Sequence, residues 1–151
     1  WFDGTVILSG SIGDGHSVAS AIALGADFAY LGTRFIATEE ANAEPEYKKM
    51  LEESAAKDIV YSSLFTGVLG NYLKPSIENA GMDPENLPDA DKNSMNFGSG
   101  GNTDSKAWKD IWGSGQGIGG IKDSPTVSEL VGRLKKEYEE AFNEFKSKMG
   151  A

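Results

Sequence analysis

A short apolar run that ends abruptly in glycines constrains the fold of this chain more than any other feature. Residues 5–8 read Thr-Val-Ile-Leu, and a Ser-Gly-Ser-Ile-Gly-Asp-Gly segment follows at 9–15. Such a run is typical of a strand buried on both faces, as the strands of parallel sheets are. A helix is expected next, because small and apolar residues then recur every three or four positions: Val18, Ala21, Ile22 and Gly25.

A second strand completes the unit. Residues 27–31 form another short apolar run, which ends at Gly32-Thr33. Ser17 is expected to cap the helix between the two strands, and Gly25 to end it. A strand, a helix and a strand joined by tight turns predict an α/β fold, with a parallel, right-handed βαβ unit over residues 1–38.

The rest of the chain, residues 39–151, is expected to be mainly helical. A charged helix is predicted over 39–57, with Pro45 as a break or as the first turn of its second part. Residues 59–63 fit either a short strand or an extended loop, and residues 69–79 are expected to be helical.

A long loop and a long helix are expected to follow. Residues 80–120 are rich in Gly, Asn, Asp, Ser and Pro, which is typical of a functional loop, with one short helix at 105–112. Residues 126–149 predict an amphipathic helix whose apolar residues share one face. Nothing resembles a linker between two self-sufficient domains, so the sequence predicts a single domain, which the resemblance given below implies to be incomplete.

The two glycine turns form a candidate anion site. Because the carboxyl ends of parallel strands meet at one edge of a sheet, the turns at 9–15 and 32–33 are expected to be neighbours. Adjacent turns of this kind hold a phosphate in α/β barrels. Backbone N–H groups, the dipole of the first helix and the Thr33 hydroxyl would supply neutral donors, while the direction of Arg34 stays open. The glycine spacing fits neither a Rossmann fingerprint nor a Walker A loop.

Composition excludes several other functions. The net charge of −9 argues against a nucleic-acid or anionic-membrane surface. The chain has no cysteine and a single histidine, which excludes thiolate chemistry and any multi-histidine metal site, and which favours a cytoplasmic location. No apolar run is long enough to span a membrane, and no segment resembles a signal peptide.

Other conspicuous residues have structural explanations. His16 is expected to be a surface residue at a helix start, and Glu39-Glu40 to support a helix N-terminus. Trp108 and Trp112 lie in the glycine-rich loop. They fit either a lid over a pocket or anchors that pin the loop to the last helix.

Several segments together resemble the nitronate monooxygenases, also called 2-nitropropane dioxygenases. They are Ser-Gly-Ser-Ile-Gly-Asp-Gly at 9–15, Ala-Leu-Gly-Ala-Asp at 23–27, Leu-Gly-Thr-Arg-Phe-Ile-Ala-Thr-Glu-Glu at 31–40, Pro-Glu-Tyr-Lys at 45–48 and Gly-Ser-Gly-Gln-Gly at 113–117. The resemblance implies a TIM-type (β/α)8 barrel that holds FMN at the carboxyl ends of its strands. It also implies the residues that would bind the flavin phosphate: Ser9, Gly10, Ser11, Leu31, Gly32 and Thr33. The family usually has Gly-Gly where this chain has Gly10-Ser11, and a serine tolerates a positive φ less well than a glycine.

The chain departs from the family mainly by what it does not contain. A complete barrel needs roughly 250 residues, so the resemblance fits only the last quarter of a barrel and the helices that follow. The family's catalytic histidine in a Gly-His-x-Gly turn has no counterpart here, and no catalytic residue is assigned. Two parallel strands leave open edges, so a homo-oligomer is expected, formed through those edges or the last helix.

Three functions remain open at this point. The first is an FMN-dependent oxidoreductase that oxidises alkyl nitronates with O₂, here represented by its C-terminal part. The second is a flavin-dependent enoyl-acyl carrier protein reductase or a barrel like inosine-monophosphate dehydrogenase. The third is a catalytically silent fragment or interaction module.

Overall fold

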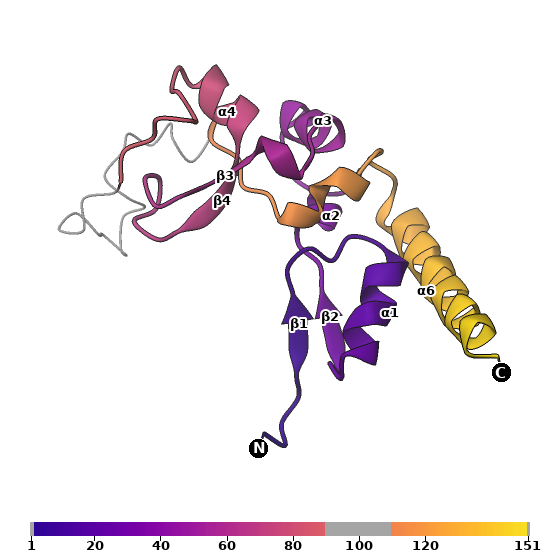
Figure 1. Ribbon diagram of the computed structural model, residues 1–151. Helices are drawn as coiled ribbons and strands as arrows, with labels where there is room; N and C mark the ends of the chain where they lie inside the picture. The colour runs from indigo at the N-terminus through magenta and orange to yellow at the C-terminus, as the bar shows by residue number, and fades with distance from the viewer. Residues whose placement is uncertain (1, 90–109, 151) are drawn as a thin grey trace. The chain divides into compact units, whose positions relative to one another are not determined.

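The computed structural model describes residues 2–89 and 110–150, and contacts group the chain into two units (Figure 1). Unit 1 joins residues 1–53 to 117–151, and unit 2 spans residues 54–116. The last helix therefore belongs with the N-terminal segment. The boundary at residue 38 and the single incomplete domain stay predictions.

Unit 1 is built on the predicted βαβ unit. Strand β1 (Ile7–Ser9) pairs in parallel with β2 (Phe28–Tyr30), and helix α1 (Gly15–Ala23) connects them. Figure 1 shows the two strands side by side with α1 next to them. The register places Ser9 opposite Tyr30, so both strands end at the same edge.

The start of α1 differs from the prediction. Asp14, and not Ser17, is the N-cap. The Asp14 carboxylate accepts from the Ser17 N–H at 2.7 Å, and the Ser17 hydroxyl accepts from the Asp14 N–H at 3.1 Å. This reciprocal capping box satisfies two N–H groups that a helix start leaves unpaired. Gly25 ends the helix as predicted, with a φ of +98° that favours glycine.

The strands are far more exposed than predicted. Burial on both faces is wrong for this chain, because Ile7, Phe28 and Tyr30 are 58%, 60% and 64% exposed. The reason is the size of the sheet: within the described ranges it has only these two strands, and α1 is the helix that packs on β2. A pair of strands needs further strands or a partner to bury its apolar side chains.

Two short helices follow β2. Helix α2 (Thr33–Ile36) is a single turn, and α3 (Pro45–Glu53) begins at its proline. The helix predicted over 39–57 is therefore wrong for residues 39–44 and for residues 54–57 after α3. Glu39 and Glu40 instead bind the segment that leads into the last helix. The Glu39 N–H donates to the Pro125 carbonyl at 3.0 Å, and the Glu40 carboxylate accepts from the Val127 N–H at 2.8 Å. Glu40 thus supports a helix start, as predicted, but of a distant helix.

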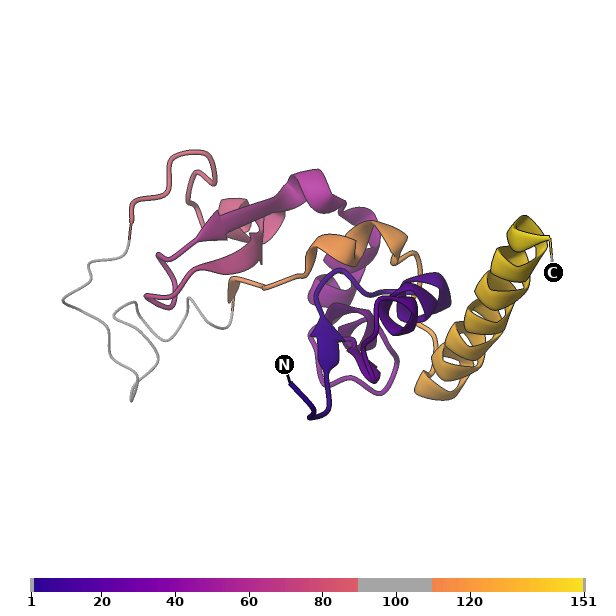
Figure 2. The same cartoon turned by 60° about the horizontal axis from the view of Figure 1, so that its bottom comes forward.

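The predicted terminal helix is confirmed as α6 (Val127–Met149). Thr126 and Glu129 form a capping box at its start, and Gly150 ends it in the left-handed region with a φ of +74°. Figure 2 shows α6 alongside α1. Leu130 is fully buried, whereas the later apolar residues Phe145 and Met149 are exposed. No helix among the described residues is long and apolar enough to cross a membrane.

Unit 2 is an antiparallel hairpin with one helix. Strands β3 (Ile59–Ser62) and β4 (Gly70–Leu73) pair, a 3-10 turn, η1 (Ala56–Asp58), precedes them, and α4 (Lys74–Asn79) follows. The helix predicted over 69–79 is thus wrong in its first half, where pairing with β3 overrides the local pattern. A small core holds the unit together: Phe65, Tyr72, Ile77 and Ile111.

The predicted loop over 80–120 falls partly outside the described residues. Most of the helix expected at 105–112, and Trp108 with it, lie in that undescribed range. The backbone of Trp112 pairs with unit 2, since its N–H donates to the Ser76 hydroxyl and its carbonyl accepts from the Leu73 N–H. At the end of the loop, η3 (Gln116–Gly120) is a 3-10 helix that the sequence did not predict.

Candidate functional site

The two predicted anion-binding turns lie at the same edge of the strand pair. In the parallel register Ser9 is opposite Tyr30, and the chain leaves the strands at Gly10 and Leu31. Ser9, Gly10, Ser11 and Gly32 are exposed, while Leu31 and Thr33 are half-buried. The structure therefore brings together all six predicted residues, and whether they bind a phosphate stays a prediction.

The first turn uses left-handed backbone at two consecutive positions. Gly10 has a φ of +96° and Ser11 a φ of +56°. Ser11 is the only residue other than glycine with a positive φ in the described ranges, and that conformation costs a residue with a side chain about 1–2 kcal/mol. Strained backbone of this kind concentrates at ligand-binding sites.

The second turn starts a helix without a side-chain cap. Gly32 is the N-cap of α2, and no side chain accepts a hydrogen bond there. Across residues 2–89 and 110–150, the N–H groups of Ser11 and Gly32 donate to no protein acceptor. Open space surrounds both glycines, because a Cβ built on Gly10 or Gly32 meets nothing within 4 Å. Both turns therefore offer accessible donors to an external anion.

Helix α1 does not contribute its N-terminus to this site, contrary to the prediction from the helix dipole. The Gly15 N–H donates to the Glu137 carboxylate at 2.8 Å, and the Ser17 N–H donates to the Asp14 carboxylate. Two carboxylates thus already satisfy the positive end of the helix. His16 is exposed on the same turn, as predicted, and no catalytic role is assigned to it.

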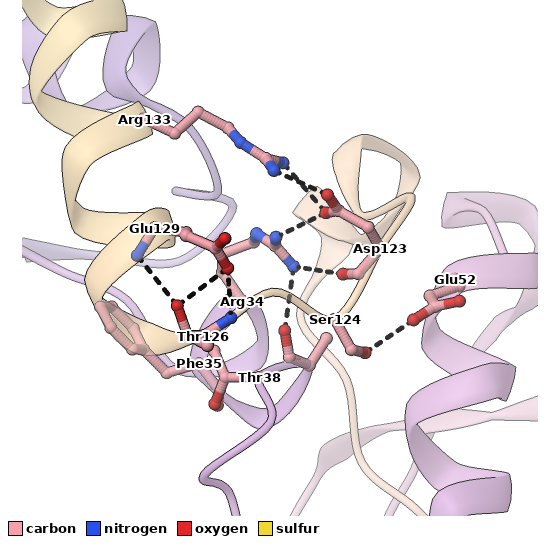
Figure 3. Close-up of polar contacts among 10 residues, drawn as sticks. Arg34, Phe35, Thr38, Glu52, Asp123, Ser124, Thr126, Glu129 and Arg133 are labelled. Carbon is pink, nitrogen blue, oxygen red and sulfur yellow. Dashed lines mark hydrogen bonds and ion pairs between the residues drawn. The ribbon is translucent and has the colours of Figure 1, made fainter.

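Arg34 points away from the turns and into the protein. Its side chain is only 3% exposed, and it donates to the Ala37 carbonyl at 3.3 Å (Figure 3). It also donates to the Asp123 carbonyl at 3.0 Å and to the Asp123 carboxylate at 2.9 Å. Burial lowers the pKa of the guanidinium from its ordinary value, and Asp123 opposes that shift. An arginine remains charged under these conditions, so Arg34 acts as a fixed structural cation.

Asp123 joins two arginines that are distant in sequence. Arg133 on α6 donates to both carboxylate oxygens of Asp123, at 2.9 and 2.6 Å (Figure 3). These hydrogen bonds from Arg133 are the main reason why the pKa of Asp123 lies below its ordinary value. The carboxylate therefore ties the residue after the second turn to the terminal helix.

The neighbouring segment is fixed by further polar contacts. The Ser124 hydroxyl donates to Glu52 on α3 at 2.6 Å, and Thr126 and Glu129 cap α6 (Figure 3). Close to the first turn, Gly117 packs directly against Ser11. Residues 117–126 therefore contact both sides of the candidate site.

Sequence reasoning missed the supporting residues Asp123, Arg133 and Glu137, and it gave Gly117 only as part of the motif at 113–117, without its contact to Ser11. Arg34 and Asp123 are 89 positions apart, and Gly15 and Glu137 are 122 apart. No local pattern indicates such pairs. The described residues contain no group of three metal-ligating side chains, and none of them is assigned as a catalytic base.

Comparison with known proteins identifies the family. The family model for nitronate monooxygenase matches residues 5–137. The chain belongs to the nitronate monooxygenase family. It is 30% identical to a nitronate monooxygenase of Paraburkholderia phytofirmans, over 93% of this chain and 40% of that protein. A probable nitronate monooxygenase of Bacillus subtilis is 28% identical over 87% of this chain and 39% of its own length.

Solved structures place the fold with larger α/β proteins. Nitroalkane oxidase from Streptomyces ansochromogenes matches with a TM-score of 0.70 and 26% identity, over 95% of this chain and 42% of that one. FabK from Thermotoga maritima matches with a TM-score of 0.68 and 21% identity, over 97% of this chain and 48% of that one. Both neighbours are of the TIM-barrel type. The chain spans about two fifths of the length of the family relatives named above.

Proposed function

We propose that this chain is the phosphate-binding, C-terminal part of an FMN-dependent oxidoreductase of the nitronate monooxygenase type. The observation that carries the proposal is the parallel pairing of β1 and β2, which sets two donor-rich turns at one edge. Family membership supports flavin as the ligand. We also propose that the βαβ unit corresponds to the last quarter of a TIM-type (β/α)8 barrel.

The residues of the two turns fit a phosphate group. Ser9, Gly10 and Ser11 would hold it from one side, and Leu31, Gly32 and Thr33 from the other, through backbone N–H groups and hydroxyls. No cationic side chain is needed, because backbone donors and a helix start can bind a phosphate on their own. The open space at Gly10 and Gly32 leaves room for close approach.

When bound, the flavin supplies the redox chemistry, taking electrons from an alkyl nitronate and passing them to O₂. The role of these residues is to bind and orient the phosphate end. The proton-removing base and the strands around the flavin ring have no counterpart in this chain. We therefore expect the 151-residue chain to bind flavin phosphate but to turn over nitronates weakly or not at all.

The exposed strand faces favour an association with other polypeptide. Ile7, Phe28 and Tyr30 are more than half exposed, so a second copy or further barrel strands would bury them. We propose a homo-oligomer for the chain on its own, and a cytoplasmic location on the compositional grounds given above.

The decisive experiment compares FMN with riboflavin, which lacks the phosphate. The affinity of each flavin is measured by quenching of flavin fluorescence, for the unchanged chain, Gly32→Asp and the matched control Gly132→Asp. Both glycines have open space around them, so neither change crowds the fold. We expect Gly32→Asp to reduce the affinity for FMN at least about tenfold by charge repulsion, and to leave the affinity for riboflavin nearly unchanged. Equal affinity of the unchanged chain for both flavins would refute the phosphate site.

A second assay separates the candidate reactions. Oxygen uptake with alkyl nitronates is compared with NADH oxidation in the presence of enoyl thioesters, using the chain loaded with FMN. Preferential turnover of the thioesters would favour the enoyl-acyl carrier protein reductase alternative. If the chain neither binds flavin nor turns over either substrate, the remaining hypothesis is a catalytically silent interaction module.

A further inference from the structure

Residues 117–123, called the strap below, contact the first candidate turn and the residue that follows the second. Gly117 lies against the first turn at Ser11, and Asp123 binds Arg34, which directly follows Gly32-Thr33. One end of the strap thus contacts the first turn, and the other binds the residue that directly follows the second turn. These contacts involve the Ser11 carbonyl and the Arg34 side chain, and not the N–H groups proposed to bind phosphate, so phosphate binding alone does not explain them.

The contact at the first turn is close enough to require glycine. A Cβ built on Gly117 would lie 2.9 Å from the Ser11 carbonyl oxygen and 3.0 Å from its carbonyl carbon. These are backbone atoms, so the turn itself would have to move. By contrast, a Cβ on Gly119 in the same 3-10 helix meets nothing within 4 Å.

The contact next to the second turn is a polar clamp around the buried Arg34 side chain. The Arg34 guanidinium reaches the carbonyl and carboxylate of Asp123 and also the carbonyl of Ala37, which ends α2 (Figure 3). The backbone of Arg34 is part of the single-turn helix α2, and its side chain binds the C-terminal end of the same helix. Because an isolated turn of helix is unstable, this clamp determines where the Gly32 N–H points.

Between these contacts the strap is held by a 3-10 helix and by buried side chains. Residues 116–120 form η3, and the Ile121 N–H donates to the Ile118 carbonyl at 2.9 Å. Ile118 and Ile121 are 0% and 1% exposed, so burial of both side chains anchors the strap. An element held in this way and attached at both ends fixes the separation of the turns.

We propose that the strap is a positioning element that sets the spacing of the two anion-binding turns, with Gly117 and the Asp123–Arg34 pair as its two points of attachment. This inference rests on the proposed function, because spacing matters only if one phosphate binds both turns. N–H···O hydrogen bonds are effective only at about 2.7–3.2 Å, so a phosphate that accepts from both turns needs them at one separation. Preorganised donors avoid the cost of ordering them on binding.

The first test needs no flavin. Backbone amide resonances and hydrogen exchange are compared for the unchanged chain, Gly117→Ala and the control Gly119→Ala. The strap predicts that Gly117→Ala shifts the amides of both turns, including residues 32–35, which Gly117 does not touch. Gly119→Ala is expected to leave both turns as they are. A response to Gly117→Ala confined to the first turn would overturn the proposal.

Asp123→Asn tests the strap from its other end and replaces Gly117→Ala should that variant fail to fold. It weakens the clamp on Arg34 and is expected to shift the amides of Ser11 and Gly117 as well as those of the second turn. Arg133→Gln is the control, because it removes the exposed partner of Asp123 and leaves Arg34 paired. Unchanged first-turn amides in Asp123→Asn would also overturn the proposal.

The second test measures selectivity for the phosphate. We expect Gly117→Ala to reduce the affinity for FMN by about fivefold or more, as for the loss of one hydrogen bond, and to leave riboflavin within about twofold. If Gly117→Ala only lowered the stability of the fold, it would reduce the affinity for FMN and for riboflavin by the same factor. That result would overturn the positioning role. If the unchanged chain does not prefer FMN, the proposed function fails, and the amide experiment still decides whether the strap couples the turns.

Discussion

The two ends of one small sheet are built very differently. At the carboxyl ends of β1 and β2, the chain returns from more than 80 residues away to bury Arg34 to 3% exposure. On the strand faces, the apolar side chains of Ile7 and Phe28 remain 58% and 60% exposed. The carboxyl ends of the two strands, called the ligand edge below, are thus packed by the chain itself. The faces of the strands, called the wall below, remain exposed.

This difference shows which part of a barrel-type site a chain can organise by itself. The turns are held by residues of the same unit, through Gly117, Asp123 and Glu137. The wall would be completed by further strands or another copy, because two strands alone cannot bury both faces. We therefore expect phosphate binding to be separable from the burial of the barrel interior, and the following changes test that separation.

The largest effect is expected where α1 meets α6. A Cβ on Gly15 would fall on the backbone of Leu134 and Tyr138, and the hydrogen bond from Gly15 to Glu137 would be lost with the displacement. We expect Gly15→Ala to lower the free energy of unfolding in urea by about 3 kcal/mol. Gly132→Ala in open space on α6 is the control and should raise it by about 0.5–1 kcal/mol. Similar values for both would mean that the α1–α6 contact does not persist in solution.

The two arginines on Asp123 should differ clearly. Arg34→Met removes the donors to three acceptors from a buried position and should cost about 2 kcal/mol of unfolding free energy. Arg133→Met removes an ion pair whose side chain is 44% exposed, which should cost about 0–1 kcal/mol. Urea unfolding of both variants gives the comparison. A larger loss for Arg133→Met would place the main attachment on α6 rather than on the turn.

The sequence predicted the ligand edge better than its support. Strands β1 and β2 follow from short apolar runs that end in glycines, and helices α1 and α6 from recurrences of three to four residues and from glycine and capping positions. All of these signals are local. Strand β4 was missed because Gly70–Leu73 becomes a strand only by pairing with β3. The clamp at Asp123 was missed for the same reason, since its partner is 89 positions away.

The local departure at Ser11 could be predicted in physical terms. Replacing the family's second glycine by serine suggested strain at a positive φ, and the structure has Ser11 at +56°. The exposure of the strands, in contrast, was predicted wrongly from their composition. An apolar run shows that a strand is suited to burial, but the elements that bury it decide whether burial occurs.

The acid stability of the ligand edge should depend on Asp123. Its folded-state pKa is lowered by Arg133, so its stabilising contribution is present above the unfolded pKa of about 3.9 and is lost as pH falls through the folded value. We expect Asp123→Asn to be less stable than the unchanged chain near about pH 6, with the difference shrinking towards about pH 3. Urea unfolding at both pH values measures this, and a constant difference would contradict it.

A smaller effect is expected from relieving strain at the first turn. Ser11→Gly removes about 1–2 kcal/mol of left-handed strain and adds about 0.5–1 kcal/mol of backbone entropy in the unfolded chain. The net gain in unfolding free energy should be about 0.5 kcal/mol. Ser9→Gly, at the end of β1 where φ is not positive, should instead lose stability. A loss in both variants would show that the Ser11 hydroxyl outweighs its strain.

The smallest effect on stability is expected at the open wall. Phe28→Ser alters a side chain that is 60% exposed, so the unfolding free energy at low protein concentration should change by no more than about 0.5 kcal/mol. Leu130→Ser, at a fully buried position, is the control and should cost about 3 kcal/mol or more. Sedimentation velocity should show weaker self-association for Phe28→Ser. If Phe28→Ser instead left self-association unchanged, the exposed strand face would not be the surface through which copies of this chain meet.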